Sequence, residues 1–149
     1  MIGKQAPHLV LKDGNGENWS LSDQQGKVVV LIFYPGDNTP VCTKQLCSVR
    51  DNWSDYKLSG AEVVGISTDS AVSHKGFADK YNLTLRLLSD EKGDVVKLYN
   101  VKSWIPGRSS RAIVVIDKLG MVTYHKIESL SVFRPKDADV LAEIKKANG

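Results

Sequence analysis

The stretch VVVLIFYPGDNTPVCTKQLC, from Val28 to Cys47, contains an apolar run, a turn and both cysteines of the chain. Its first seven residues are apolar, β-branched or aromatic, and they are too few to cross a membrane. Such a run is typical of a strand buried on both faces. Pro35 and Gly36 end that strand. Thr39 is suited to the N-cap of a following helix and Pro40 to its first position, which makes Cys42 the third helical residue.

A cysteine at the start of a helix faces backbone N–H groups that have no partner within the helix. The positive end of the helix dipole favours an anion there, and thiols in such places ionise more readily than an ordinary thiol of pKa about 8.5. The thiolate is the nucleophilic form. However, Cys42, Leu46, Val49, Trp53 and Tyr56 also lie at helical spacing, so Cys42 could simply pack in an apolar helix face.

The separation of Cys42 and Cys47 limits how they can form a disulfide. Five residues of helix rise about 7.5 Å and place the two Cα atoms about 8 to 9 Å apart. A disulfide needs Cα atoms within roughly 7 Å. The pattern predicts one helix over residues 39–59, so pairing requires its first turns to unwind. The two cysteines would then form a switch rather than a permanent crosslink.

Pro35, Thr39 and Cys42 match the Pro-x-x-x-Thr-x-x-Cys motif of the peroxiredoxins, thiol enzymes that reduce hydroperoxides. The segments LCSVRDN (residues 46–52) and VGISTD (residues 64–69) resemble the subgroup called peroxiredoxin Q or bacterioferritin comigratory protein. The resemblance extends from about the third residue to the C-terminal helix. It implies an α/β thioredoxin-like fold, with a central mixed β-sheet flanked by helices and an N-terminal β-hairpin.

The resemblance also implies roles for four residues. Cys42 would be the peroxidatic cysteine, which attacks the peroxide and becomes a sulfenic acid. Cys47 would be the resolving cysteine, which converts that sulfenic acid into a disulfide. Thr39 would hydrogen-bond the peroxide and the thiolate, and Pro35 would shield the sulfur from water.

Arg111 matches the arginine that peroxiredoxins bring over the active-site sulfur, because it stands six residues before Asp117. Without the resemblance, a strand-end arginine in a surface ion pair would be the simpler interpretation, and such pairs contribute little. Arg108 is the neighbour most easily mistaken for it. The loop of residues 102–110 is shorter than in many relatives and contains Trp104, which could line the rim of the pocket or merely pack.

The rest of the chain alternates strand and helix patterns. A strand, a helix and a strand over residues 28–67 predict a right-handed parallel unit whose ligands gather at the carboxyl ends of the strands. The whole pattern indicates a single α/β domain over residues 1–149. The other expected elements are a hairpin (7–12 and 17–21), a helical turn (22–25), a helix (70–81), a strand (85–88), a helix (91–100), a hairpin (111–117 and 121–126) and a last helix from near Pro135.

Composition limits the class of protein. The 149 residues, 42% hydrophobic and 25% charged, suit one globular domain. A formal charge of +3, carried by scattered lysines, gives no footprint for nucleic acid. We expect no membrane partner and a cytoplasmic location, because Met1 to Pro7 lack an apolar signal region. We expect neither metal nor cofactor: Cys-x4-Cys does not match the usual zinc pairs, and His8, His74 and His125 lie far apart.

These observations predict a thiol-dependent peroxidase that reduces hydrogen peroxide and organic hydroperoxides to water or alcohols. An intramolecular disulfide between Cys42 and Cys47 would be recycled by thioredoxin or a similar dithiol, and the protein would be a monomer or a weak dimer. One alternative is a general thiol-disulfide oxidoreductase, for which a Cys-x-x-Cys motif is expected. Another is a non-enzymatic redox-sensing module, in which oxidation only exposes a surface.

Overall fold

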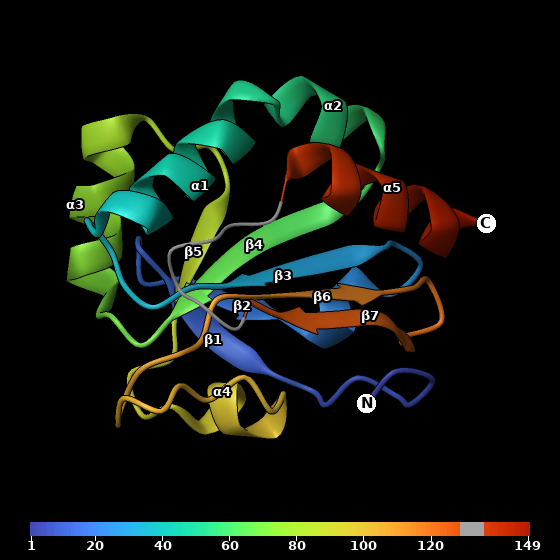
Figure 1. The fold of residues 1–149 in the computed structure, drawn as a ribbon, viewed down its shortest axis with the longest axis horizontal. Helices are drawn as coiled ribbons and strands as arrows, with labels where there is room; N and C mark the ends of the chain where they lie inside the picture. The colour runs from blue at the N-terminus through green and yellow to red at the C-terminus, as the bar shows by residue number, and fades with distance from the viewer. Residues whose placement is uncertain (129–135) are drawn as a thin grey trace.

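The structure is a computed structural model that describes residues 1–128 and 136–149. In this part of the chain a seven-stranded mixed sheet has the order β2-β1-β5-β4-β3-β6-β7 (Figure 1). The strands are β1 (Val10–Asp13), β2 (Asn18–Ser20), β3 (Val29–Phe33), β4 (Glu62–Ser67), β5 (Arg86–Ser89), β6 (Ala112–Ile116) and β7 (Val122–Ile127). The helices are the 3-10 turn η1 (Leu21–Gln24), α1 (Pro40–Asp51), α2 (Trp53–Leu58), α3 (Ala71–Tyr81), α4 (Asp94–Leu98) and α5 (Asp137–Asn148).

Strand β3 lies inside the sheet because all five of its residues are apolar and can be buried on both faces. It pairs parallel with β4, where Leu31 faces Val64, and antiparallel with β6, where Leu31 faces Val114. The predicted parallel unit is therefore confirmed. Its two strands end at the same edge of the sheet, where the β3–α1 loop begins.

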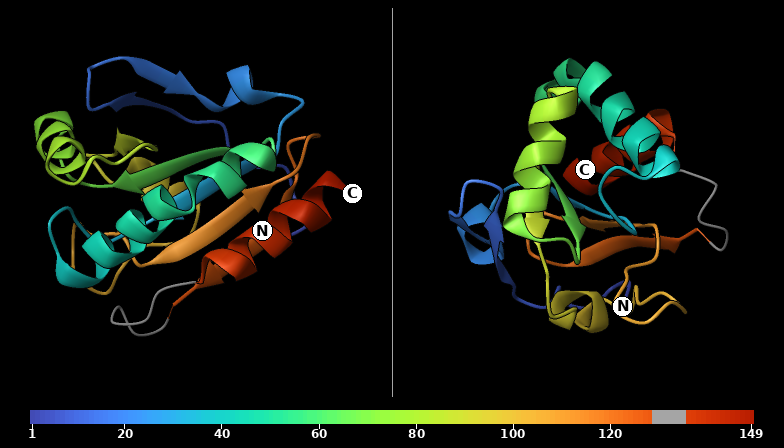
Figure 2. Two further views of the ribbon diagram at one scale, coloured as in Figure 1. Left: turned by 90° about the horizontal axis from the view of Figure 1, so that it is seen from above. Right: turned by 90° about the vertical axis from the view of Figure 1, so that its left-hand side faces the viewer.

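Helices cover the two faces of the sheet unequally. The helices α1, α2, α3 and α5 lie over one face, and α4 lies over the other (Figures 1 and 2). Side chains along β3 alternate between two cores: Val30 and Ile32 pack with Leu46 under the helical layer, whereas Leu31 and Phe33 pack on the α4 side. The segment after β3 therefore crosses to the face that carries α1.

Several predicted elements form with ends shifted by a few residues. The N-terminal hairpin pairs β1 with β2, a helical turn follows it, α3 begins after Ser70, and β6 pairs with β7. Ser70 accepts a hydrogen bond from the backbone N–H of Ser73, which makes it a true N-cap. The predicted start of the last helix, near Pro135, lies outside the described residues.

The predicted single helix over residues 39–59 is wrong. Asn52 interrupts it with φ −104° and ψ 18°, so that α1 and α2 are separate helices. The side-chain amide of Asn52 donates to the backbone oxygen of Ser48 at 2.9 Å, and the backbone N–H of Asn52 donates to the same oxygen at 3.0 Å, so Asn52 closes the end of α1. Gly60, with φ 76°, follows the end of α2 as expected.

The predicted helix over residues 91–100 is also too long. Helix α4 begins only at Asp94, because Gly93 before it has a left-handed φ of 74°. The carboxylate of Asp90 accepts the backbone N–H groups of Val95 and Val96 and so holds this short helix. A turn therefore replaces the expected first helical turn.

Candidate active site

The start of α1 places Cys42 at the carboxyl end of β3. Thr39 occupies the N-cap with φ −80° and ψ 148°, Pro40 is the first helical residue and Cys42 is the third, as predicted. The first helical hydrogen bond runs from the backbone N–H of Thr43 to the oxygen of Thr39 at 2.8 Å. The Thr39 side chain does not cap the helix, however, because its hydroxyl donates to the oxygen of Gly36 at 3.0 Å. The expectation that the Thr39 side chain caps the helix is therefore wrong, because its hydrogen bond lies within the loop.

The sulfur of Cys42 lies against a buried arginine. Cys42 is 0% exposed, and Nη2 of Arg111 donates to its Sγ at 3.1 Å. Arg111, 2% exposed, also donates through Nη1 to Oε1 of Gln45 at 2.7 Å. A guanidinium at this distance stabilises negative charge on the sulfur, and burial strengthens the effect. The alternative of a surface ion pair for Arg111 is thus wrong.

Gln45 was not singled out from the sequence. It stands three residues after Cys42, so the two side chains share one face of α1. A polar residue on that otherwise apolar face was the available signal, because buried polar groups require partners. Gln45 fixes the direction of the Arg111 fork, which then points one of its N–H groups at the sulfur.

Arg108 holds the loop rather than the sulfur. Its Nη1 donates to the backbone oxygen of Pro35 at 3.1 Å and lies 3.7 Å from Oδ1 of Asp69. A Cβ atom on Gly36 would lie only 2.7 Å from the same Nη1, so the glycine allows the arginine to approach. The side chain of Arg108 is 47% exposed, in contrast to that of Arg111.

Arg111, which contacts the buried sulfur, also lines a cavity of about 250 Å³. Thr39 and Pro35 line the cavity together with this buried arginine. Trp104 stands on the loop of residues 102–110, which supplies much of the remaining lining. Trp104 is 91% exposed, so of the two options it lines the rim and does not pack. The lining residues are Pro35, Thr39, Ser103, Trp104, Ile105, Arg108, Ser109, Ser110, Arg111 and Glu128.

Cys47 lies about 1.4 helical turns beyond Cys42, in the same helix α1. It is partly buried, and both cysteines are free thiols. Five positions of intact helix separate them, which is too far for a disulfide. Three of the five candidate residues, Pro35, Thr39 and Arg111, line the cavity. Cys42 contacts Arg111 behind it, and Cys47 does not line it.

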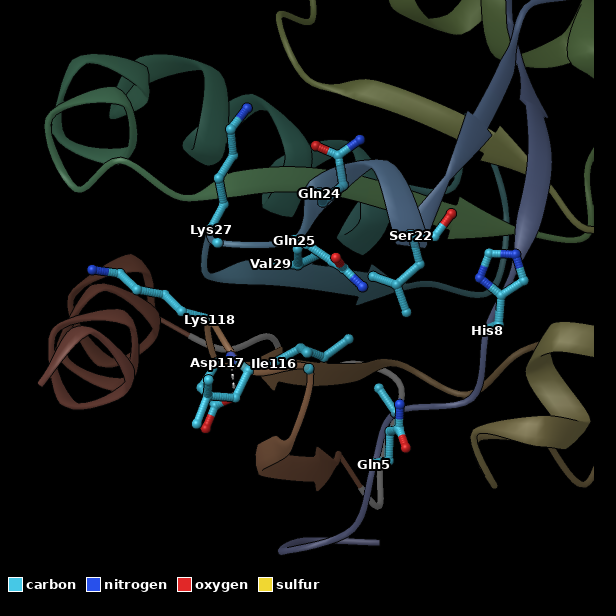
Figure 3. Close-up of a pocket in the computed structure, with 15 residues that line it drawn as sticks. Gln5, His8, Ser22, Gln24, Gln25, Lys27, Val29, Ile116, Asp117 and Lys118 are labelled. Atoms are coloured by element: carbon cyan, nitrogen blue, oxygen red, sulfur yellow. Dashed lines mark hydrogen bonds between the residues drawn. The ribbon is translucent and has the colours of Figure 1, made fainter.

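A larger cavity of about 470 Å³ lies at the other end of β3 (Figure 3). Side chains from the N-terminal segment, from η1 and from the ends of β3 and β6 surround it, among them Gln5, Gln24 and Gln25. None of the five candidate residues lines it, whereas Pro35, Thr39 and Arg111 line the cavity of about 250 Å³. Within residues 1–128 and 136–149, no three His, Cys, Asp or Glu side chains gather to hold a metal ion. The cavity that Arg111 lines is therefore the candidate active site.

The chain is similar to plant proteins. The chain is 51% identical to peroxiredoxin Q of Triticum aestivum, over 82% of this chain and 57% of the relative. It is 50% identical to peroxiredoxin Q of Sedum lineare, over 80% of this chain and 65% of the relative. The chain thus spans less than two thirds of the length of these relatives.

The expectation of a cytoplasmic location is contradicted by these relatives. Both are named as chloroplastic, as is the similar protein of Arabidopsis thaliana.

In the described part of the chain, no helix has the length and apolar character needed to cross a membrane.

Solved structures agree with the expected fold. Peroxidoxin BcpB of Mycobacterium tuberculosis superposes with a TM-score of 0.86 at 31% identity, over 98% of this chain and 97% of that one. The reduced 2-Cys peroxiredoxin of Plasmodium vivax gives a TM-score of 0.89 at 28% identity, over 97% of this chain and 80% of that one. The thioredoxin-like fold is therefore confirmed. Residues 2–125 match the AhpC/TSA family, and the chain belongs to that family as a peroxiredoxin of the Q type.

Proposed function

We propose that this chain is a thiol-dependent peroxidase that uses Cys42 to reduce hydrogen peroxide and organic hydroperoxides. The observation that carries the proposal is the contact between the Arg111 guanidinium and the Cys42 sulfur at the start of a helix. Such a contact keeps a thiolate stable in a buried place, where an unpaired anion would be costly. Membership of the AhpC/TSA family supports the same activity.

In the first step the Cys42 thiolate attacks the outer oxygen of the hydroperoxide. An S–O bond forms, the O–O bond breaks, and the departing alkoxide or hydroxide takes up a proton to become an alcohol or water. Cys42 is left as a sulfenic acid, oxidised by two electrons. Arg111 stabilises the charge on the departing oxygen, the Thr39 hydroxyl holds the peroxide, and Pro35 keeps water from the sulfur.

In the second step the Cys47 thiolate attacks the Cys42 sulfenic sulfur. An S–S bond forms and the hydroxyl group leaves, to be protonated to water. Because an intact α1 keeps the two residues apart, its first turns must unwind before the step can occur. A dithiol such as thioredoxin then supplies two electrons, reduces the disulfide and allows the helix to form again.

Rapid-mixing kinetics on two variants test this function. Cys42→Ser should abolish peroxide turnover, because a serine hydroxyl does not ionise near neutral pH as a thiol can. Cys47→Ser should keep the first oxidation but form no intramolecular disulfide, so that mass spectrometry finds sulfenic or overoxidised Cys42. The two serine variants control for each other, because each removes one sulfur from the same helix.

Two results would contradict the assignment. Turnover of Cys42→Ser above half that of the wild type would exclude Cys42 as the nucleophile. Normal cycling of Cys47→Ser with thioredoxin would exclude Cys47 as the resolving residue. A redox-sensing module would oxidise once without repeated turnover, and a thioredoxin-type oxidoreductase would reduce insulin, so both alternatives are measured in the same assays.

A further inference from the structure

A buried acid–base pair lies beside the active-site loop and takes no part in the mechanism above. Asp37 belongs to the loop that joins β3 to α1, and His74 belongs to α3. Nδ1 of His74 lies 2.8 Å from Oδ2 of Asp37, and the two side chains are 0% and 1% exposed, respectively. Ionisable groups buried this deeply are costly unless they are fully paired.

The hydrogen-bond partners indicate where the protons lie. Nε2 of His74 is 3.0 Å from the backbone oxygen of Leu88, which can only accept, so Nε2 carries a proton. Burial alone would raise the pKa of Asp37, but hydrogen bonds from His74 and Tyr34 outweigh it and hold that pKa below its ordinary value. The carboxylate is therefore ionised and accepts from Nδ1. His74 thus donates from both ring nitrogens, one to the loop and one to β5.

Asp37 is held by other elements as well. Its carboxylate accepts the hydroxyl of Tyr34 at 2.6 Å and the hydroxyl of Ser73 at 2.7 Å. Its backbone N–H donates to Oδ2 of Asp69 at 2.8 Å. One residue of the loop is thereby tied to the end of β3, to α3 and to the segment after β4.

Asp37 lies three residues before Pro40, the first residue of α1. Between them the chain passes through Asn38, whose φ of 62° turns the backbone into the left-handed region. The hydroxyl of Thr39 then donates back to the oxygen of Gly36, which closes the turn. So short and so constrained a connection means that the position of Asp37 sets where the helix begins.

We propose that Asp37 and His74 are positioning residues that favour the wound start of α1, in which Cys42 meets Arg111, over the unwound start, in which Cys42 can reach Cys47. This inference rests on the proposed function, because it assigns the two forms to successive steps of that cycle. Loss of the pair frees the loop and lowers the population of the wound form. Oxidation by peroxide should then slow, whereas disulfide formation should not.

Single-turnover kinetics of Asp37→Asn and His74→Gln test the inference. Each variant should slow the oxidation of Cys42 by about tenfold, within the range that a misplaced reacting group costs. Disulfide formation from the sulfenic acid should be unchanged or faster. The double variant should add little to either single one, because the two side chains form one interaction.

Asp90→Asn is the matched control. Asp90 is also a buried carboxylate in a loop before a helix, but it holds α4 on the opposite face of the sheet. Its replacement should leave both catalytic steps unchanged. Equal slowing of both steps in the Asp37 and His74 variants, or the same pattern in Asp90→Asn, would overturn the inference, because a general loss of stability would explain it.

Amide hydrogen exchange of the reduced protein separates this inference from the proposed function, because it needs no peroxide. Residues 36–43 should exchange faster in Asp37→Asn and in His74→Gln than in the wild type. A wild type that fails to react with peroxide would contradict the function alone, and faster exchange would still support the pair. Unchanged exchange at these residues would contradict the pair whatever the activity.

Discussion

The two ends of α1 are held in different ways. At its start, Cys42 contacts the buried guanidinium of Arg111. This contact is stronger when the sulfur is a thiolate than when it is neutral. At its end, the carboxylate of Asp137 in α5 accepts hydrogen bonds from Ser48, from Asn52 at 3.2 Å and from the hydroxyl of Tyr56 at 2.5 Å. We call these three donors and their acceptor the Asp137 cluster.

This difference indicates which end of the helix can come apart. Oxidation of Cys42 to the sulfenic acid removes the negative charge from the sulfur, and with it much of the attraction of Arg111. The Asp137 cluster contains no sulfur and is unaffected by that reaction. The helix should therefore unwind from its start and stop near Ser48, which frees Cys42 while Cys47 stays close to the fixed part.

Arg111→Ala should have the largest effect. In the proposed mechanism the charge of Arg111 stabilises both the thiolate and the departing oxygen, and the loss of one such donor slows a reaction by roughly 100-fold to 1,000-fold. Stopped-flow measurement of Cys42 oxidation gives the rate. Arg111→Lys should recover only part of it, because an ammonium group cannot contact the sulfur and Gln45 with one planar fork.

Arg108→Ala is the control for that variant. Arg108 carries the same charge and lies in the same cavity, but it bonds the backbone of Pro35 instead of the sulfur. It should slow oxidation by far less than Arg111→Ala. Equal and small effects of the two replacements would mean that the start of α1 is not held by the charge of Arg111.

Asp137→Ala should have the next largest effect, on stability rather than on chemistry. It leaves the buried hydroxyl of Tyr56 without its acceptor and removes one of the two hydrogen bonds of the Asn52 amide, which costs about 2 to 3 kcal/mol in the free energy of unfolding. Urea denaturation measures this loss. Hydrogen exchange of the oxidised variant should also show that the unwinding of α1 extends past Ser48 towards α2.

Asp139→Ala separates the cluster from the helix dipole. Asp139 lies in the same first turn of α5, and its exposed carboxylate interacts with the dipole as that of Asp137 does. Its loss should cost less than about 1 kcal/mol. If the two variants were destabilised equally, the hydrogen bonds of Asp137 would not stabilise the end of α1 beyond the effect of the helix dipole.

Local sequence patterns were sufficient at the start of α1 but not at its end. The apolar run, Pro35, Thr39 and Pro40 determine a strand, a turn and a helix start by short-range geometry alone. The interruption at Asn52 depends in part on a hydrogen bond to Asp137, 85 residues away. No local pattern contains that contact, and so the sequence predicted one continuous helix.

The site shows the same limit. Arg111 was placed near Cys42 only through the resemblance to peroxiredoxins, since 69 residues separate them. Gln45, Asp37 and His74 were not identified, because each has its main partner in a distant element of the fold. The roles of the five candidate residues remain predictions that the variants above measure.

The smallest expected effect concerns access to the start of α1. Trp104 and Ile105 give the cavity an exposed apolar rim, whereas the buried Arg111 gives it a polar end. An organic hydroperoxide can place its peroxide group at the polar end and its apolar part on the rim, and hydrogen peroxide has no such part. A contact of about 40 Å² with the indole contributes roughly 1 kcal/mol, or about fivefold in affinity.

Trp104→Ala should therefore raise KM for cumene hydroperoxide about fivefold and leave KM for hydrogen peroxide unchanged. Val72→Ala is the control, because Val72 is 84% exposed on α3 and does not line the cavity. Steady-state kinetics with both peroxides give the ratio. An equal change for the two substrates would show that the rim acts on the loop and on Arg111 rather than on the substrate. The start and the end of α1 would then differ in the residues that stabilise them, but the rim beside the start would not contribute to substrate binding.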